Sequence, residues 1–363
     1  MTGLPLFVEF DDLIIMERFS TGGGQSSGLF RCKAPDGEIY LLKTYTDEVQ
    51  QSLRPMPLQE LIMMRGMLGP EERAELDARC AWPRAAVIKD TAINGVLIPP
   101  ASAEMFETVA GRTKTQTRPR HLEGLARPPD AAGRIGLPYY EIPQKLAILS
   151  GYFDTMRWLH DRGYAIGDLQ PRNALFSADG ARVLLIDCDS CVPLLGTPAF
   201  VAQDPEIWKT PGEEAFTIRT DLYKFAWMIV RCVQENLESR TVRRDLLLPA
   251  MQGAVCDLLE ALCAGADLEN ASNLLRGKAT LWRVLVVGDA LYVRNDRSLR
   301  ARWEPRAVEP AVQRPAVAEE EYFDDGDVME PAGRRSVLRT MAWVLILLAV
   351  FVCVGLLAAD QLS

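Results

Sequence analysis

The stretch that decides the fold is IGDLQPRN at residues 166–173, followed by the apolar run 183–186 and then Asp187. It presents a carboxylate, an amide five residues later, and a second carboxylate at the end of a strand-like run. Phosphoryl transfer to a hydroxyl group needs these groups: one carboxylate orients the hydroxyl and takes its proton, while the amide and the other carboxylate hold magnesium. We therefore expect Asp168 to act as catalytic base, with Asn173 and Asp187 as Mg²⁺ ligands.

The surroundings of this stretch make the interpretation more specific. An Asp and an Asn at this spacing could otherwise be ordinary turn residues. Here an amphipathic segment, 146–160, precedes them and LLID at 184–187 follows. With these neighbours the sequence resembles the protein kinase superfamily. The resemblance covers about 8–285 and implies a two-lobed, protein-kinase-like α+β fold, with a small β-rich N-lobe over about 8–100 and a larger helical C-lobe over about 101–285.

A strand lysine and a helix glutamate should then lie upstream. The run 39–43, IYLLK, is strand-like and ends in Lys43, and Glu60 follows 17 residues later in a segment expected to be helical from about Pro57. The resemblance implies that Lys43 contacts the α and β phosphates of ATP and that Glu60 fixes its orientation. The alternative is that both are solvated surface charges.

A glycine-rich turn precedes Lys43 at residues 21–30, TGGGQSSGLF. Glycines let backbone N–H groups approach phosphates closely. The turn departs from the GxGxxG pattern because Gln25 takes the middle position, and an ordinary hairpin is the alternative. The ATP-contacting residues expected here, in addition to Lys43, are Gly23, Gly24, Gln25, Ser26, Ser27 and Gly28.

Two further segments resemble structural elements of the same family. Residues 204–206, DPE, resemble its APE element, and 220–226, TDLYKFA, resemble its DxWxxG helix. The resemblance implies that Glu206 pairs with a C-lobe arginine and that Asp221 braces the catalytic loop through backbone amides.

The catalytic motifs also depart from the family pattern. HRD is replaced by 166–168, IGD, and DFG by 187–189, DCD, while Gln170 stands where a lysine is usual. Loss of the HRD arginine argues against control through a phosphate bound there. These departures leave two alternatives: a catalytically weak pseudokinase acting as an ATP-binding membrane scaffold, and a small-molecule kinase of the aminoglycoside phosphotransferase type.

The C-terminal part of the chain predicts a membrane anchor. Residues 341–359 are 19 residues without a charge, enough to span roughly 28 Å as a helix. Three arginines precede them, so the positive-inside rule places the preceding domain in the cytoplasm. Between the domain and this helix we expect a short extension of the domain over 286–303 and an acidic, proline-containing disordered linker over 304–336.

Charge and cysteine usage exclude other classes of protein. Of the formal charge of −9, residues 304–333 alone carry −7, so no dominant basic face for nucleic acid is expected. The eight cysteines are scattered, which argues against a disulfide framework. Cys188 and Cys191 have CxxC spacing without a second such pair and are interpreted as ordinary thiols. The stretch 111–138, rich in Arg, Pro, Gly and Thr, is expected to be a long loop or insertion.

Together these patterns predict a single-pass, tail-anchored Ser/Thr-type protein kinase that uses ATP and Mg²⁺ at the cytoplasmic face of a membrane. The expected partners are ATP, a protein substrate that the sequence does not identify, and the lipid bilayer. No nucleic-acid partner is expected.

Overall fold

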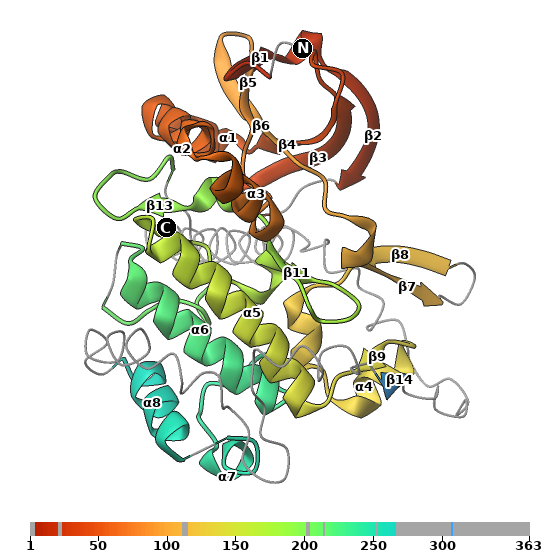
Figure 1. Cartoon of the computed structure of the whole chain (residues 1–363), viewed down its shortest axis with the longest axis vertical. Helices are drawn as coiled ribbons and strands as arrows, with labels where there is room; N and C mark the ends of the chain where they lie inside the picture. The colour runs from red at the N-terminus through yellow and green to blue at the C-terminus, as the bar shows by residue number, and fades with distance from the viewer. Residues whose placement is uncertain are drawn as a thin grey trace, which may run out of the picture.

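The computed structural model describes residues 4–20, 24–110, 115–200, 204–212, 215–251, 253–265 and 306–307. Over these residues a small β-rich lobe is stacked on a larger helical lobe (Figure 1). The predicted two-lobed α+β architecture is therefore confirmed.

The N-lobe is built on a six-stranded sheet in the order β1-β5-β6-β4-β3-β2. All neighbouring strands are antiparallel except β1 and β5. β4 lies inside the sheet, and the register places Lys43 between Leu29 of β3 and Val96 of β6. The close approach of β4 and β6 requires Gly95, because an added Cβ there would collide with the carbonyl of Lys43. The strands are β1 (Phe7–Glu9), β2 (Ile14–Ser20), β3 (Ser26–Lys33), β4 (Ile39–Tyr45), β5 (Ala85–Lys89) and β6 (Ala92–Ile98).

Three helices connect β4 to β5: α1 (Asp47–Ser52), α2 (Pro55–Met67) and α3 (Pro70–Arg79). The helix predicted from about Pro57 is thus present and begins two residues earlier. Proline at the first turn costs α2 and α3 no hydrogen bond, since the first amides of a helix have no partner within it. α2 buries Leu58, Leu61 and Ile62 at helical spacing.

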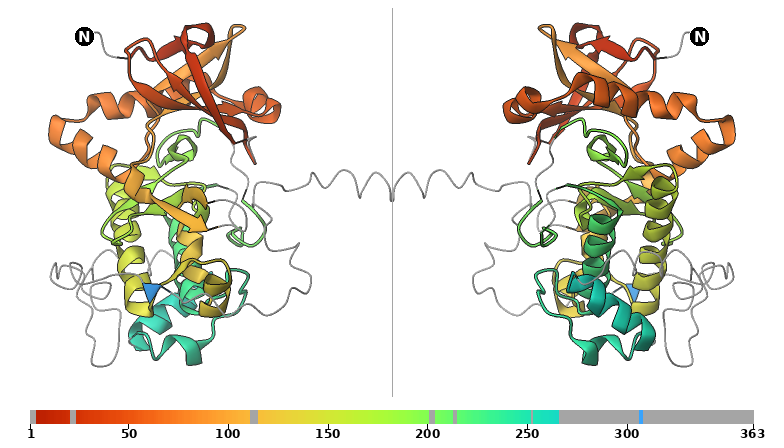
Figure 2. Two further views of the ribbon diagram at one scale, coloured as in Figure 1. Left: turned by 90° about the vertical axis from the view of Figure 1, so that its right-hand side faces the viewer. Right: turned by 90° about the vertical axis from the view of Figure 1, so that its left-hand side faces the viewer.

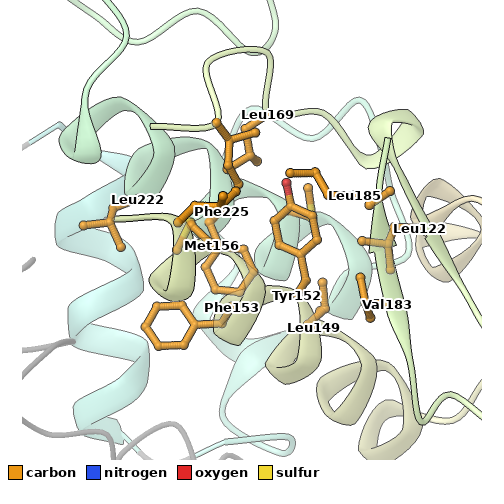
Figure 3. Close-up of a cluster of buried hydrophobic side chains, with 14 of the residues drawn as sticks. Leu122, Leu149, Tyr152, Phe153, Met156, Leu169, Val183, Leu185, Leu222 and Phe225 are labelled. Carbon is orange, nitrogen blue, oxygen red and sulfur yellow. The ribbon is translucent and has the colours of Figure 1, made fainter. Parts of the chain in front are cut away.

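The C-lobe is organised around two long helices, α5 (Ile142–His160) and α6 (Ile218–Val233), which run side by side (Figures 1 and 2). Tyr152 and Phe153 of α5 stack against Phe225 of α6, with ring centroids 5.8 and 5.5 Å apart (Figure 3). All but the first two residues of α6 are buried. α6 is therefore a core helix on which surrounding segments can be fixed.

Short elements complete the C-lobe around these helices. The hairpin β11–β12 follows the stretch 166–173. The paired strands β10 and β13 lie before this stretch and after the hairpin in the chain. The two lobes meet where Cys80, after α3, forms a bridge with Leu185 of β12. The elements are α7 (Arg244–Leu247), α8 (Gly253–Cys263), β10 (Tyr164–Ala165), η4 (Pro171–Asn173), β11 (Ala174–Phe176), β12 (Val183–Leu185), η5 (Cys188–Ser190) and β13 (Val192–Pro193).

The stretch 111–138 was expected to be a long loop or an insertion, and it is not a long loop. Apart from 111–114, which lie outside the described residues, it contains regular elements that bury Leu122 and Leu125. Its high content of Arg, Pro and Gly hid these short elements, because each has only a few residues in which to show a period. They are β8 (Thr115–Pro119), paired with β7 (Phe106–Ala110), then η3 (Leu122–Ala126), α4 (Pro129–Arg134) and the start of β9 (Pro138–Tyr139).

The predicted segments beyond the kinase-like domain fall almost wholly outside the described residues. These are the extension 286–303, the linker 304–336 and the membrane helix 341–359. Residues 306–307 are the exception, since they form β14, which pairs with β9. Within the described part of the chain, no helix has the length and apolar character to cross a membrane.

Trp82 should be a major contributor to stability. It is fully buried, its Nε1 donates to the carbonyl of Leu61 at 2.9 Å, and its ring meets Tyr164 edge-on at 5.7 Å. Trp82→Ala is expected to lower the free energy of unfolding by about 3–5 kcal/mol because it leaves a cavity and removes the hydrogen bond from the indole to this carbonyl. Met67→Ala, at a side chain 72% exposed, should change it by less than about 0.5 kcal/mol. Urea denaturation measures both, and equal effects would contradict this account of the core.

Candidate active site

The stretch 166–173 is held in place by a fully buried carboxylate on α6. Asp221 accepts hydrogen bonds from the backbone N–H of Ile166 at 2.7 Å and of Gly167 at 3.4 Å. His160, the last residue of α5, places its Nε2 2.8 Å from the same carboxylate. The predicted brace from Asp221 to the loop is confirmed, and it joins α5, α6 and the loop at one point.

Gly167 is required by this arrangement. Its φ of +79° is in the left-handed region, and an added Cβ would lie 2.5 Å from the carbonyl oxygen of Ser190. The loop and the segment after Asp187 therefore approach each other more closely than any side chain at position 167 would allow.

Asp168 is oriented by two amide side chains from its own loop. Asn173 Nδ2 donates to the backbone carbonyl and to Oδ2 of Asp168, both at 2.9 Å, and Gln170 Nε2 donates to Oδ1. Burial raises the pKa of the Asp168 carboxyl, the hydrogen bond from Gln170 lowers it, and the charge of Asp187 raises it. The structure thus brings Asp168 and Asn173 together, with Asp187 near enough to act on Asp168.

Lys43 joins the N-lobe to the C-lobe at the candidate site. It is 5% exposed, and its Nζ lies 3.3 Å from Asp187 Oδ1 and 2.9 Å from Asp189 Oδ1. Burial disfavours its charge, but the two carboxylates outweigh this and raise its pKa. Lys43 is therefore a buried cation and not a solvated surface charge.

Asp189 is the functional candidate that the motif comparison missed. It is 1% exposed, bound to Lys43, and its Oδ2 accepts from the hydroxyl of Tyr45 at 3.0 Å. The DxD pattern at 187–189 was the available signal, since a second carboxylate that is buried so close to the first needs a cation to compensate its charge.

Glu60 does not come to Lys43 in this structure. It lies on the exposed side of α2, whose buried side carries Leu58, Leu61 and Ile62. Among the described residues, the ion-pair partners of Lys43 are the two aspartates of the DCD stretch. The family's lysine–glutamate pair is thus replaced here by a lysine–aspartate pair, and a catalytic role for Glu60 remains only a prediction from the resemblance.

The glycine-rich turn is described in part. Gly23 lies outside the described residues, while Gly24, with φ +58°, and Gln25 form the turn before β3. Ser27 Oγ donates to Thr44 Oγ1 at 2.9 Å and to the carbonyl of Tyr45 at 3.0 Å. Because Thr44 points to the opposite sheet face from Lys43, Ser27 also lies away from the Lys43 side.

The rest of this turn is bound within the sheet. Ser26 Oγ donates to the carbonyl of Gly28 at 3.2 Å. An added Cβ at Gly28 would lie 2.7 Å from the ring of Phe30, so Gly28 provides space for this ring. The carbonyl of Gln25 accepts from the backbone N–H of Thr46 at 3.2 Å, which leaves the backbone N–H groups of Gly24 and Gln25 as the candidates to meet a phosphate.

The site fits Mg²⁺ only together with phosphate oxygens. In the described residues, no three His, Cys, Asp or Glu side chains are grouped as a self-sufficient metal site. Asp187 offers a carboxylate whose side chain is 37% exposed. Asn173 makes its hydrogen bonds to Asp168 through Nδ2, so these bonds do not use its Oδ1. One or two such ligands plus phosphates and water are what Mg²⁺ usually takes.

Comparison with known proteins gives limited matches. No family model matches the chain. A 94-residue segment is 32% identical to the ovarian-specific serine/threonine-protein kinase Lok of Drosophila melanogaster, covering 23% of this chain and 19% of that protein. The chain thus matches about a fifth of the length of this curated relative. The kinase domain of PknI from Mycobacterium tuberculosis aligns with a TM-score of 0.48 and 13% identity, covering 77% of this chain and 100% of that domain.

The chain has a protein kinase-like fold. Three features make up this fold: a strand lysine in a small, mostly antiparallel sheet, a stretch at 166–173 braced by a buried aspartate, and an Asp-containing turn after β12 that reaches the lysine.

Gly167→Ala should be far more damaging than Gly163→Ala. Both glycines have φ near +80°, but only at Gly167 does the added Cβ meet backbone, since nothing lies within 4 Å at Gly163. Gly163→Ala should cost about 1 kcal/mol of stability, the penalty for a left-handed alanine. Gly167→Ala should cost at least about 2 kcal/mol, because the loop must also move. Thermal denaturation compares them, and equal losses would refute the close approach to Ser190.

Proposed function

We propose that this chain is an ATP-dependent phosphotransferase, of the Ser/Thr protein kinase type, which transfers the γ-phosphate to a protein hydroxyl. The observation that carries the proposal is the meeting of Lys43, from the central strand of the N-lobe sheet, with Asp187, from the C-lobe. A buried ammonium and a partly exposed carboxylate from opposite lobes are suited to hold the phosphates and their counter-ion between them.

In the proposed reaction, Asp168 binds the acceptor hydroxyl and receives its proton as the oxygen bonds to the γ-phosphorus and the bond to the β-phosphate oxygen breaks. Asn173 holds the Asp168 carboxylate in a fixed direction through its Nδ2. Lys43 binds the oxygens of the α and β phosphates. Asp189 holds the lysine in place and is itself held by the hydroxyl of Tyr45. Mg²⁺, which Asp187 and Asn173 would bind, supplies charge neutralisation on the phosphates.

A protein acceptor is supported by two observations. The chain includes an APE-like segment, which is fixed on α6, and a DxWxxG-like segment, which forms part of α6 itself. In addition, the fly protein that matches 94 residues of this chain is a serine/threonine-protein kinase. A small-molecule kinase is disfavoured because it has less need of these segments.

A catalytically weak pseudokinase is the second candidate, and Gln170 favours it. Gln170 occupies Oδ1 of Asp168 and provides no positive charge toward a transferring phosphoryl group. The two candidates share the ATP-binding residues and differ in whether phosphate leaves ATP.

A position at the cytoplasmic face of a membrane is part of the proposal and rests on the sequence alone. Its support is the uncharged run 341–359 with arginines before it.

Phosphate transfer should depend on Asp168 and Lys43. With labelled ATP, Mg²⁺ and a mixed protein substrate, Asp168→Asn should lower transfer about 10²- to 10⁴-fold, since the base is removed. Lys43→Met should lower it about 10²-fold or more, because the phosphates lose a buried cation. Lys33→Met, at an exposed lysine on the neighbouring strand, is the matched control and should keep wild-type activity. Transfer that persists in Asp168→Asn would refute the mechanism, and ATP binding without transfer by wild type would favour the pseudokinase.

The lysine-positioning carboxylate should be Asp189 and not Glu60. Asp189→Asn keeps the shape of the side chain but removes the charge that faces Lys43 at 2.9 Å, so ATP affinity should fall about tenfold. Glu60→Gln should leave affinity within about twofold, because Glu60 is exposed and apart from Lys43. Titration with ATP measures both. A large loss in Glu60→Gln would mean that α2 rotates to form the family's usual pair when ATP binds.

A further inference from the structure

Lys224, on α6, is a fully buried lysine that the proposed reaction does not use. Its Nζ donates to the backbone carbonyl of Gly167 at 2.8 Å and to Asp204 Oδ1 at 2.6 Å, and it lies 4.3 Å from the ring centre of Phe216. An ammonium group is costly to bury unless it is paired and hydrogen-bonded, so this position is strongly specified.

The Gly167 carbonyl is the link to the catalytic base. It accepts from Lys224 and also from the backbone N–H of Leu169 at 2.9 Å, so it closes the tight turn that contains Asp168. Asp221 binds the amide side of the same turn. Since Asp221 and Lys224 are three residues apart, they lie on one face of α6 and grip the turn from one rigid element.

Asp204 connects this grip to the segment that follows the DCD stretch. The side chain of Asp204 is 9% exposed and is held by Lys224. Trp208 follows Asp204 by four residues, and its ring centre lies 4.1 Å from the guanidinium of Arg231 on α6. Arg231 also donates to the carbonyl of Ile207 at 2.9 Å. Segment 204–208 is therefore fixed on α6 at two places. Among the described residues, the predicted pairing of Glu206 with a C-lobe arginine is not seen: Glu206 is exposed, and Arg231 contacts the next two residues, Ile207 and Trp208, instead.

The chain has no side chain at position 167 with which to bind a phosphate. A glycine stands there, and the close approach of the Ser190 carbonyl leaves no room for a larger residue. A phosphorylated residue in segment 190–206 therefore cannot form an ion pair with a side chain at position 167. The Lys224–Asp204 pair already supplies a charge contact between that segment and the loop.

We propose that Lys224 is a positioning residue: its ion pair with Asp204 and its bond to the Gly167 carbonyl align Asp168 without phosphorylation of segment 190–206. The consequence for catalysis rests on the proposed kinase function, whereas the effect on the loop itself does not.

The direct test is hydrogen exchange of the full chain, followed by mass spectrometry of peptides that span 164–173. In Lys224→Met, exchange in this region should become about tenfold faster or more, because the carbonyl that closes the turn loses its charged donor. Peptides from α6, residues 218–233, should keep wild-type protection. Unchanged exchange over 164–173 would overturn the proposal whether or not the protein transfers phosphate.

A second variant separates positioning from general stability. Lys224→Met combined with Asp204→Leu removes both charges, and replacing a buried ion pair by apolar residues often restores stability. The double variant should therefore regain a Tm near that of wild type while 164–173 still exchanges rapidly. If exchange over 164–173 returns to the wild-type rate together with Tm, the pair is only structural and the proposal fails.

The matched control is Lys145→Met, on α5. Lys145 is also buried and likewise bonds a carboxylate and a carbonyl, Glu235 at 2.7 Å and Cys232 at 3.3 Å, but away from the catalytic loop. It should lower Tm and leave exchange over 164–173 unchanged. Faster exchange there in Lys145→Met would show that any buried-charge loss loosens the loop, which contradicts a specific role for Lys224.

Transfer assays then test the consequence for activity. The double variant should show a kcat at least about tenfold lower than wild type with an unchanged KM for ATP, since Lys224 is not among the phosphate-binding residues. Phosphatase-treated wild type and Thr197→Ala should keep transfer within about twofold. A tenfold loss on phosphatase treatment would overturn the phosphorylation-independent alignment. Absence of transfer by wild type would instead count against the kinase function, while the exchange result would still decide the positioning role.

Discussion

The structure depends on the buried carboxylate of Asp221. A fully buried charge must be satisfied by hydrogen bonds, and its partners are two backbone amides of the catalytic loop and His160 of α5. One side chain thus fixes the end of α5 and the start of the loop relative to the core helix α6. Lys224, one turn further on, does the same for the next carbonyl and for Asp204. The position of Asp168 follows from these contacts, because it lies directly after the gripped glycine.

The lower lobe was largely predictable from the sequence because its chemistry is local. Asp168 and Asn173 are five residues apart and meet within one loop, and Asp187 follows a short apolar strand that pairs with the strand after Asn173. Lys43 was predictable as well, because its strand pattern and place in the chain agreed with the family. In each case the sequence separation itself limits where the side chain can lie.

The remaining contacts could not be read from spacing. Asp189 was identified in the sequence only as a departure from DFG, and its role appears only when β4 brings Lys43 and Tyr45 to it. Glu60 has the expected spacing from Lys43, but the rotation of α2 about its axis turns it to solvent, and that rotation is set by which residues pack under the helix. Lys224 likewise resembles an ordinary helix lysine until tertiary structure surrounds it.

Nucleotide binding with and without Mg²⁺ tests the central claim most directly, since the account makes Lys43 and Asp187 the two sides of one ATP–Mg²⁺ site. The measurement is a calorimetric titration of the full chain with a non-hydrolysable ATP analogue, for wild type and Asp187→Asn. The account predicts that Mg²⁺ tightens binding to wild type about tenfold or more and that Asp187→Asn abolishes this gain. Binding that ignores Mg²⁺, or an equal gain in Asp187→Asn, would contradict it.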